Sequence, residues 1–316
     1  MSKPRRFASR ILSASLAASA LALAPEANAA SVTIKHAQGE TAVPINPQKI
    51  AVFDLSTLDN LDHLGIKVTG VPHESVNLPR NLKKYEGDDF IKIGSLHEPD
   101  YEVINAVAPD LIIVGALTAS KYDALAKIAP TIDLTAWGHN LIAQVEANVK
   151  TLGRIFSRQA QARAEIERLD AAIAALKAKT RGKGKGLVIM TSGAKISGYG
   201  PGSVFGFVHE DFGVTPASLD INPAAHGQPI GSEFILETNP DWLFVIDRDT
   251  AIGPSIDREG DSARQVLDND LIRLTTAWKE GQVIYLNSTD WCLAWAGLTS
   301  LHRAINQISQ AFDRAE

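Results

Sequence analysis

The strongest constraint in this sequence is a helix–Pro–Asp–strand segment that occurs twice. Residues 102–114 have a counterpart 131 residues downstream, at residues 233–245, and the residue types agree at about nine positions. In each copy a short helical pattern stops at a proline, and an uninterrupted apolar run follows the aspartate. Proline cannot continue a helix, and such a run is typical of a strand covered on both faces. The repeat therefore predicts two similar lobes with buried sheets.

The other apolar runs fit the same scheme. Strands are expected at residues 49–54, 67–71, 131–134, 186–191 and 282–286, and a closing helix at residues 298–312. Because strands alternate with helices, the fold class is α/β with a parallel sheet in each lobe, as in Rossmann-like domains.

A long helical pattern separates the two halves. Between residues 141 and 179, apolar residues recur at three- and four-residue steps, which predicts a single interlobe helix of about 39 residues and about 58 Å. A bend near Gly153 or Ser157 is an alternative. The expected organisation is an N-terminal lobe at 30–140, an interlobe helix at 141–180 and a C-terminal lobe at 181–316.

The first 29 residues are typical of a signal peptide. Four basic residues precede an apolar run of about 14 residues, and Ala27-Asn28-Ala29 supplies a small-x-small cleavage site. The run is shorter than the roughly 20 residues that span a bilayer. We expect cleavage after Ala29 and export to the periplasm. No membrane anchor is expected, because no cysteine lies near the cleavage site to carry a lipid.

Composition and motifs exclude several function classes. The net charge of −5 and the lack of a basic domain argue against a nucleic-acid partner. Cys292, the single cysteine, allows neither an internal disulfide nor a paired-cysteine zinc motif. No Gly-x-Ser-x-Gly elbow, Walker loop or His-Glu-x-x-His helix is present, and the eight histidines form no pair with metal-ligand spacing. Because no catalytic motif is present, a binding protein is favoured over an enzyme. A metal that arrives already chelated needs few protein ligands, so the scattered histidines still permit such a ligand.

Two residues are candidate ligand contacts because of their position. His226 lies in the loop 222–228, and its imidazole is a borderline ligand for iron; the alternative is an ordinary exposed histidine. Arg248 follows the apolar strand 242–246, beyond whose carboxyl end a ligand crevice is expected. Its guanidinium suits an anion or an electron-rich ring, unless it pairs with a neighbouring aspartate.

Three aromatic residues are candidates for stacking on a planar ligand. They are Tyr199, Trp291 and Trp295, and each has packing in the core or at its rim as the alternative.

Taken together, these segments resemble the periplasmic binding proteins of iron-siderophore ABC importers, especially the catecholate branch. The stretches that carry the resemblance are residues 53–65, 109–114, 122–130, 226–228, 244–248 and 284–286. The resemblance covers essentially the whole mature chain. It implies the class III architecture, in which two Rossmann-like lobes are bridged by one long helix.

The resemblance also implies a function. The protein would be a soluble monomeric receptor without enzyme activity or an intrinsic cofactor. It would capture a ferric siderophore between its lobes and deliver it to an ABC permease that an ATPase drives. His226 would ligate the chelated iron, Arg248 would face the anionic chelate, and Glu102 and Glu233 would dock on arginines of the permease. The repeat supports the last point because it puts the two glutamates at equivalent positions.

Departures from the family pattern leave the ligand open. Cys292 stands where the family carries an iron-ligating tyrosine, and it either replaces that ligand or only packs. Leu117 or Thr118, and Val204, stand where the family tends to place arginines. A less anionic siderophore is therefore expected, and haem, a corrinoid or another metal chelate is the alternative. A periplasmic enzyme on the same fold is a further alternative.

Overall fold

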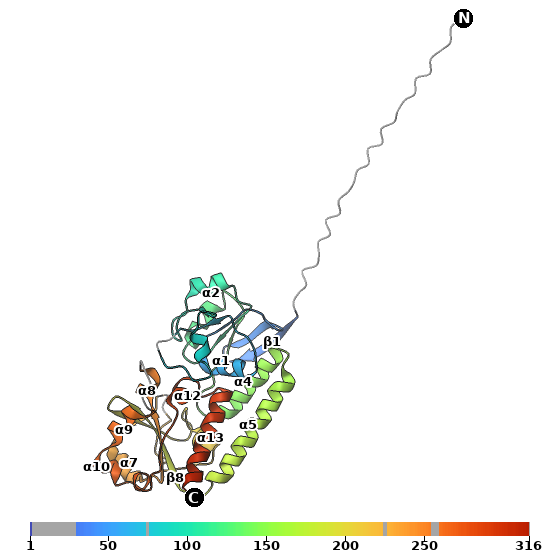
Figure 1. The fold of residues 1–316 in the computed structure, drawn as a ribbon. Coiled ribbons are helices and arrows are strands. Elements are labelled where there is room, and N and C mark those ends of the chain that lie inside the picture. The colour runs from blue at the N-terminus through green and yellow to red at the C-terminus, as the bar shows by residue number, and fades with distance from the viewer. Residues whose placement is uncertain (2–29, 74–75, 224–225, 254–258, 316) are drawn as a thin grey trace.

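Two lobes form the molecule, and helices join them along one side (Figure 1). The structure is a computed structural model that describes residues 1, 30–73, 76–223, 226–253 and 259–315, so the predicted signal peptide lies outside the described residues apart from Met1. The joining helices are α4 (Leu141–Ile155), α5 (Gln159–Thr180) and α13 (Leu298–Arg314). None of the helices described has the length and apolar character that a membrane span requires.

The N-terminal lobe contains a five-stranded parallel sheet in the order β5-β4-β3-β6-β7 and a separate β1-β2 hairpin. Its elements are β1 (Ser31–His36), β2 (Gly39–Pro44), β3 (Ile50–Val52), α1 (Leu55–His63), β4 (Gly70–Val71), η1 (Lys83–Glu86), β5 (Ile91–Lys92), α2 (Tyr101–Val107), β6 (Leu111–Val114), η2 (Ala119–Lys121), α3 (Tyr122–Leu125) and β7 (Thr131–Asp133). The expected parallel sheet is confirmed for this lobe.

The C-terminal lobe has a mixed sheet in the order β11-β9-β8-β12-β13, with β10 beside the start of β8. Its elements are β8 (Lys185–Ser192), β9 (Lys195–Tyr199), α6 (Phe207–Glu210), β10 (Thr215–Pro216), β11 (Gln228–Ile230), α7 (Ser232–Thr238), β12 (Trp242–Asp247), α8 (Arg248–Ile252), α9 (Asp261–Leu267), α10 (Asp270–Arg273), α11 (Thr276–Lys279), β13 (Val283–Tyr285) and α12 (Ser288–Leu293). The expectation of a purely parallel sheet is wrong here. Only two residues join β8 to β9, and such a short loop forces an antiparallel pair.

The sequence repeat is confirmed in atomic detail. Helices α2 and α7 each have seven residues, end in a left-handed residue and lead into a fully buried strand. The carboxylate of Asp110 accepts a hydrogen bond from the backbone N–H of Lys49 at 2.8 Å. The carboxylate of Asp241 accepts one from the N–H of Lys185 at 2.7 Å. In each lobe the repeated aspartate therefore ties the start of one strand to the start of its neighbour.

The expectation of a single interlobe helix is wrong, and the alternative of a bend near Gly153 or Ser157 is confirmed. The segment forms two helices that pack against each other. Ser157 has a left-handed backbone, with φ of 53°, and this ends the path of α4. A methyl group at Gly153 would lie 2.7 Å from Cβ of Ala162, so the two helices are close at this point. Both helices bury a stripe in the core, which keeps the apolar spacing continuous through the break. Helix α4 still bridges the lobes, since Leu141 lies in the C-terminal core and Ile155 in the N-terminal core.

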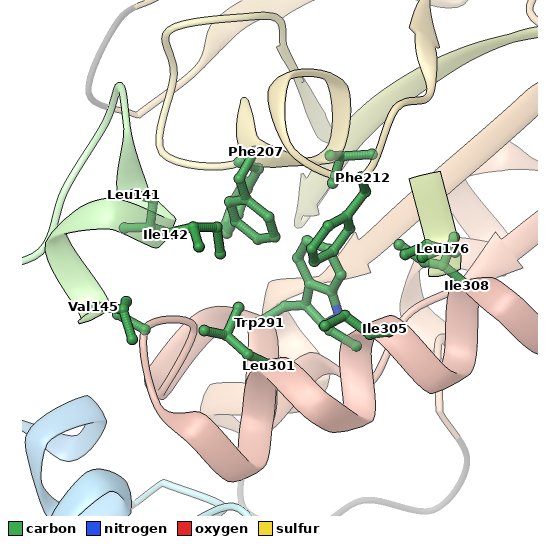
Figure 2. Packing of buried hydrophobic residues seen from close by; sticks show 14 of the residues in the cluster. Leu141, Ile142, Val145, Leu176, Phe207, Phe212, Trp291, Leu301, Ile305 and Ile308 are labelled. Carbon is green, nitrogen blue, oxygen red and sulfur yellow. The ribbon is translucent and has the colours of Figure 1, made fainter. Parts of the chain in front are cut away.

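The core of the C-terminal lobe holds the three joining helices together. Figure 2 shows Trp291 and Phe212 between side chains of α4, α5 and α13. The ring of Trp291 stacks on that of Phe207, with 5.4 Å between centroids and 16° between planes. At the far end of α13, Phe312 stacks on Trp242 at 4.0 Å. The joining helices are thus part of the largest hydrophobic cluster, and not a separate linker.

Helix α13 receives its N-terminal caps from the other lobe. The side-chain oxygen of Asn60 accepts from the N–H of Leu298 at 2.8 Å, and Oδ2 of Asp59 accepts from the N–H of Ser300 at 2.9 Å. These partners lie 238 and 241 residues apart in sequence and are buried. Gly297 itself offers no capping side chain, and a methyl group there would collide with Asp59.

A buried polar network extends this contact. The other carboxylate oxygen of Asp59 accepts from Asn81 at 2.7 Å, and Asn81 accepts from Arg303 of α13 at 2.8 Å. Arg303 also donates to Asp290 at 2.7 Å. Since each buried group has a partner, the network fixes how α1 and α13 sit against each other.

We expect Gly297→Ala to destabilise the protein by about 2 kcal/mol, because the added methyl group displaces Asp59 and uncaps α13. Urea unfolding of the purified chain measures this change. Gly87→Ala is the matched control, since its backbone is ordinary and the nearest atom would be 3.4 Å away. Equal stability of the two variants would contradict the capping role of Asp59.

Candidate ligand-binding site

Each sheet has a topological switch point at the carboxyl ends of its parallel strands. The strand order reverses between β3 and β6 in one lobe and between β8 and β12 in the other. Ligands of open α/β sheets bind outside the carboxyl ends of the strands at such points. Asn77 of the N-terminal lobe donates to the carbonyl of Gly253, at the end of α8, at 2.8 Å. The C-terminal switch point, where α8 begins, therefore lies beside the N-terminal lobe.

Arg248 lies at the C-terminal switch point, as predicted from its place after a strand. It is exposed, and its guanidinium donates to the hydroxyl of Ser192, at the end of β8, at 3.4 Å. The alternative of an ion pair with a neighbouring aspartate is not seen among the described residues. The carboxylate of Asp247 accepts from the hydroxyl of Thr250 and the N–H of Ala263, and that of Asp249 accepts from the N–H of Gly193. Among the described residues, the charge of Arg248 is thus available to a ligand.

His226 and Tyr199 lie together, but they differ in accessibility. His226 is exposed, and its imidazole has no hydrogen-bond partner among the described residues. Tyr199 is only 3% exposed, and its hydroxyl donates to the carbonyl of His226 at 3.0 Å. Burial raises the pKa of Tyr199 to about 12, so the phenol stays neutral. Tyr199 thus supports the His226 loop and does not offer a ring face to the crevice.

Trp291 is a core residue in this structure. It is 1% exposed, and its ring lies against Phe205 and Phe207. The sequence pattern could not separate this residue from Trp295, four positions later. Trp295 is half-buried, and its indole N–H donates to the carbonyl of Ala136 at 3.4 Å.

Cys292, the residue after Trp291, carries a neutral thiol. Burial raises its pKa to about 12, although the nearby charge of Arg248 acts in the opposite direction. Metal ions bind the thiolate rather than the thiol. The side chain of Cys292 packs against the hydrophobic cluster of the C-terminal lobe, and this contact favours packing, the second of the two roles that the sequence left open. Within the described part of the chain, no group of three or more His, Cys, Asp or Glu side chains could hold a metal ion.

The positions that depart from the family pattern have different surroundings. Leu117, on the loop after β6, is 45% exposed. Thr118 is fully buried and donates to the carbonyl of Leu96, and Val204 lies in the hydrophobic core. Of these three positions, only Leu117 is exposed.

A small polar cavity marks the N-terminal switch point. Its volume is about 10 Å³, roughly the space of one water molecule. The polar and aromatic residues around it are Asp54, Ser56, Thr57, Asn60, Asn148 and Trp295. Asp54 follows β3 and caps α1 by accepting from the N–H of Thr57 at 2.7 Å. We call this space the switch-point cavity.

Sequence reasoning named Trp295 as a candidate but missed Trp137, its partner in an aromatic pair beside this cavity. Trp137, on the loop after β7, meets Trp295 edge to face, with 5.2 Å between centroids and 82° between planes. Gln144 fixes the backbone of Trp137 by accepting from its N–H and donating to its carbonyl. The position of Trp137 just after a predicted strand was the available signal.

Glu102 and Glu233 occupy equivalent places on the two lobes. Each is exposed in the first turn of its helix, α2 or α7, and neither forms an ion pair with a described residue. Figure 1 shows α2 on the outer part of one lobe and α7 on the outer part of the other.

Comparisons with known proteins agree with this architecture. The chain is 40% identical over 288 residues to the petrobactin-binding protein YclQ of Bacillus subtilis, covering 90% of this chain and 89% of that protein. It is 35% identical over 290 residues to the ferric-anguibactin-binding protein FatB of Vibrio anguillarum, covering 89% and 87%. The crystal structure of YclQ matches with a TM-score of 0.85 and 39% identity, covering 90% of this chain and 99% of that one.

A second solved structure gives the same result, and so does a family profile. The periplasmic catecholate-siderophore binding protein VctP of Vibrio cholerae matches with a TM-score of 0.82 and 31% identity, covering 89% of this chain and all of that one. The profile described as periplasmic binding protein matches residues 50–289. The chain therefore belongs to the periplasmic binding protein family.

Proposed function

We propose that this protein is the substrate-binding component of an ABC importer, and that it captures a ferric siderophore in the crevice between its lobes. The observation that carries the proposal is Arg248, exposed at the C-terminal switch point without a carboxylate partner among the described residues. Relatives named for binding petrobactin and ferric anguibactin support the choice of a ferric siderophore. The protein makes and breaks no covalent bonds, and its ligand is cargo.

The residues of the crevice have different roles in binding. Arg248 attracts the anionic donor groups around the iron, since a charge-assisted hydrogen bond is stronger than a neutral one. His226 approaches the iron centre from the loop that Tyr199 holds. Cys292 packs against the C-terminal core, and donors of the siderophore together with this histidine hold the iron. The ligand lies between the N-terminal lobe (residues 30–140) and the C-terminal lobe (residues 181–316). Helices α4 and α5 bridge the two lobes.

Delivery uses the outer surface of both lobes. Glu102 and Glu233 present one carboxylate on each lobe to arginines of the permease, and an ATPase supplies the energy for transport. A signal peptide that is cleaved after Ala29 directs the protein to the periplasm, where it acts as a monomer.

We expect saturable quenching of the five tryptophans when the protein is titrated with its ferric siderophore. Arg248→Gln should weaken binding by about tenfold or more, because a hydrogen bond to a charged group contributes about 1.5–3 kcal/mol. His226→Ala should weaken it as well. A panel of ferric catecholates, hydroxamates and citrate, with haem and cobalamin as further ligands, identifies the class.

The control is Arg181→Gln, an exposed arginine that precedes β8 at the opposite edge of the sheet. It should bind like the unaltered protein. No response to any ferric siderophore, together with tight binding of haem or cobalamin, would keep the fold and refute the proposed ligand.

Docking is tested separately from capture. Glu102→Gln and Glu233→Gln should each lower siderophore-dependent iron uptake by about tenfold, since each removes one charge of a pair at the rim of an interface. Their affinity for the ferric siderophore should not change. Glu237→Gln, exposed in the same helix as Glu233, is the matched control. Normal uptake by the double variant would rule out this docking surface.

A further inference from the structure

The helix that carries Arg248 is attached to both lobes. Helix α8 begins at this arginine, has only five residues and lies at the end of the C-terminal lobe nearest the N-terminal lobe (Figure 1). At its start, the carboxylate of Asp247 accepts from the N–H of Thr250 at 3.2 Å. The carboxylate of Asp249 accepts from the N–H of Gly193, just after β8, at 2.6 Å. These contacts tie the start of α8 to the ends of β8 and β12 in its own lobe.

The other end of α8 is held by one residue of the N-terminal lobe. The side-chain amide of Asn77 donates to the carbonyl of Gly253 at 2.8 Å and to that of Thr250 at 3.2 Å. The backbone N–H of Asn77 donates to the carbonyl of Ala251 at 3.2 Å. The side-chain partners lie 173 and 176 residues away in sequence, so this cap crosses from one lobe to the other.

The cap meets a need of the helix itself. The last carbonyls of a helix have no partner within it, and a helix of little more than one turn is not stable alone. Thr250 and Ala251 are buried, so their carbonyls depend on donors from the protein. Asn77 supplies these donors from outside the lobe to which α8 belongs.

The place of Arg248 depends on the backbone of this helix. Among the described residues, its guanidinium has one hydrogen-bond partner, the hydroxyl of Ser192 at 3.4 Å. A hydrogen bond of this length fixes a side chain only weakly. The capped carbonyls of Thr250 and Gly253 lie within about one and a half turns of Arg248, so a shift of the cap reaches the arginine directly.

Asn77 is itself held firmly by the N-terminal lobe. Leu78 is buried in the core of that lobe, and Val76 packs against the same core. A displacement of one lobe relative to the other would therefore move the cap. The start of α8 would stay on the C-terminal sheet, and the helix would lose the donors at its end.

We propose that Asn77 is a positioning residue for Arg248. It caps α8 from the opposite lobe and thereby sets where the guanidinium meets the anionic donors of the chelate. Asn77 acts through the helix and not by contact with the ligand. The inference rests on the proposed function, in which Arg248 binds the ferric siderophore.

The test is a double-mutant cycle on binding. The probes are ferric tris(2,3-dihydroxybenzoylglycine), ferrioxamine B and ferric citrate, and the cycle uses the one that the unaltered protein binds most tightly. Asn77→Ala should weaken its binding about fivefold, because both side-chain hydrogen bonds to α8 are lost. In the Arg248→Gln background the same change should weaken binding less than twofold, since no guanidinium remains to be misplaced.

Hydrogen exchange measured by NMR reports the cap without any ligand. The N–H of Gly253 donates to the carbonyl of Asp249 at 2.8 Å and closes the last turn of α8. Asn77→Ala should speed the exchange of this N–H about tenfold, because an uncapped helix end opens more often. The rates in α1, on the other side of the N-terminal lobe contact, should not change.

Two further variants serve as controls. Asn77→Leu keeps the bulk of the side chain and removes both donors, so it should match Asn77→Ala in affinity and in exchange. Asn105→Ala changes an exposed asparagine of the same lobe, whose amide donates to the carbonyl of Tyr101 within α2. It should leave both the affinity and the exchange of α8 unchanged.

The possible failures are distinguishable. An equal loss of affinity in the two backgrounds would show that Asn77 only holds the lobes together, and would overturn the inference while the proposed function stands. Unchanged exchange at Gly253 would do the same. If none of the three probes binds to the unaltered protein, the proposed function and the inference are both refuted.

Discussion

The capping of α13 by Asp59 and Asn60 is the contact on which the arrangement of the lobes depends. A helix that begins inside a protein has N–H groups that water cannot reach, and each one left without a partner costs about 1–3 kcal/mol. Gly297 cannot supply a cap, and the partners come instead from α1 of the other lobe. Because α13 also lies in the C-terminal core, the two lobes cannot separate without exposing these donors.

The same contact helps to hold the two lobes in one arrangement. The lobes are held by the polar network behind the crevice, by α4 in both cores and by the bond from Asn77 to the end of α8. The side chain of His63 adds a 3.0 Å contact from α1 to Glu165 of α5. A site that is ordered before binding loses little conformational entropy when the ligand arrives. Tight capture therefore does not require a large closure of the lobes.

Most of the fold could be predicted from the sequence because the repeated segments are local. The proline, the aspartate and the apolar run of each copy act on their immediate neighbours, and Asp110 and Asp241 do the same thing in both lobes. The apolar spacing continues through Ser157 and favoured a single helix, so the bend near Gly153 or Ser157 was predicted only as an alternative. The site depends on long-range contacts, so sequence found Arg248 by its strand but could not tell the buried Trp291 from Trp295.

Asp54 shows how a local explanation can be complete for a position and still incomplete for a charge. The residue caps α1, and this accounts for a short polar side chain after β3. Asparagine would cap about as well and would carry no negative charge in a place where burial and Asp133 disfavour one. The hydrogen bond from the start of α1 and the positive end of its helix dipole offset part of this cost.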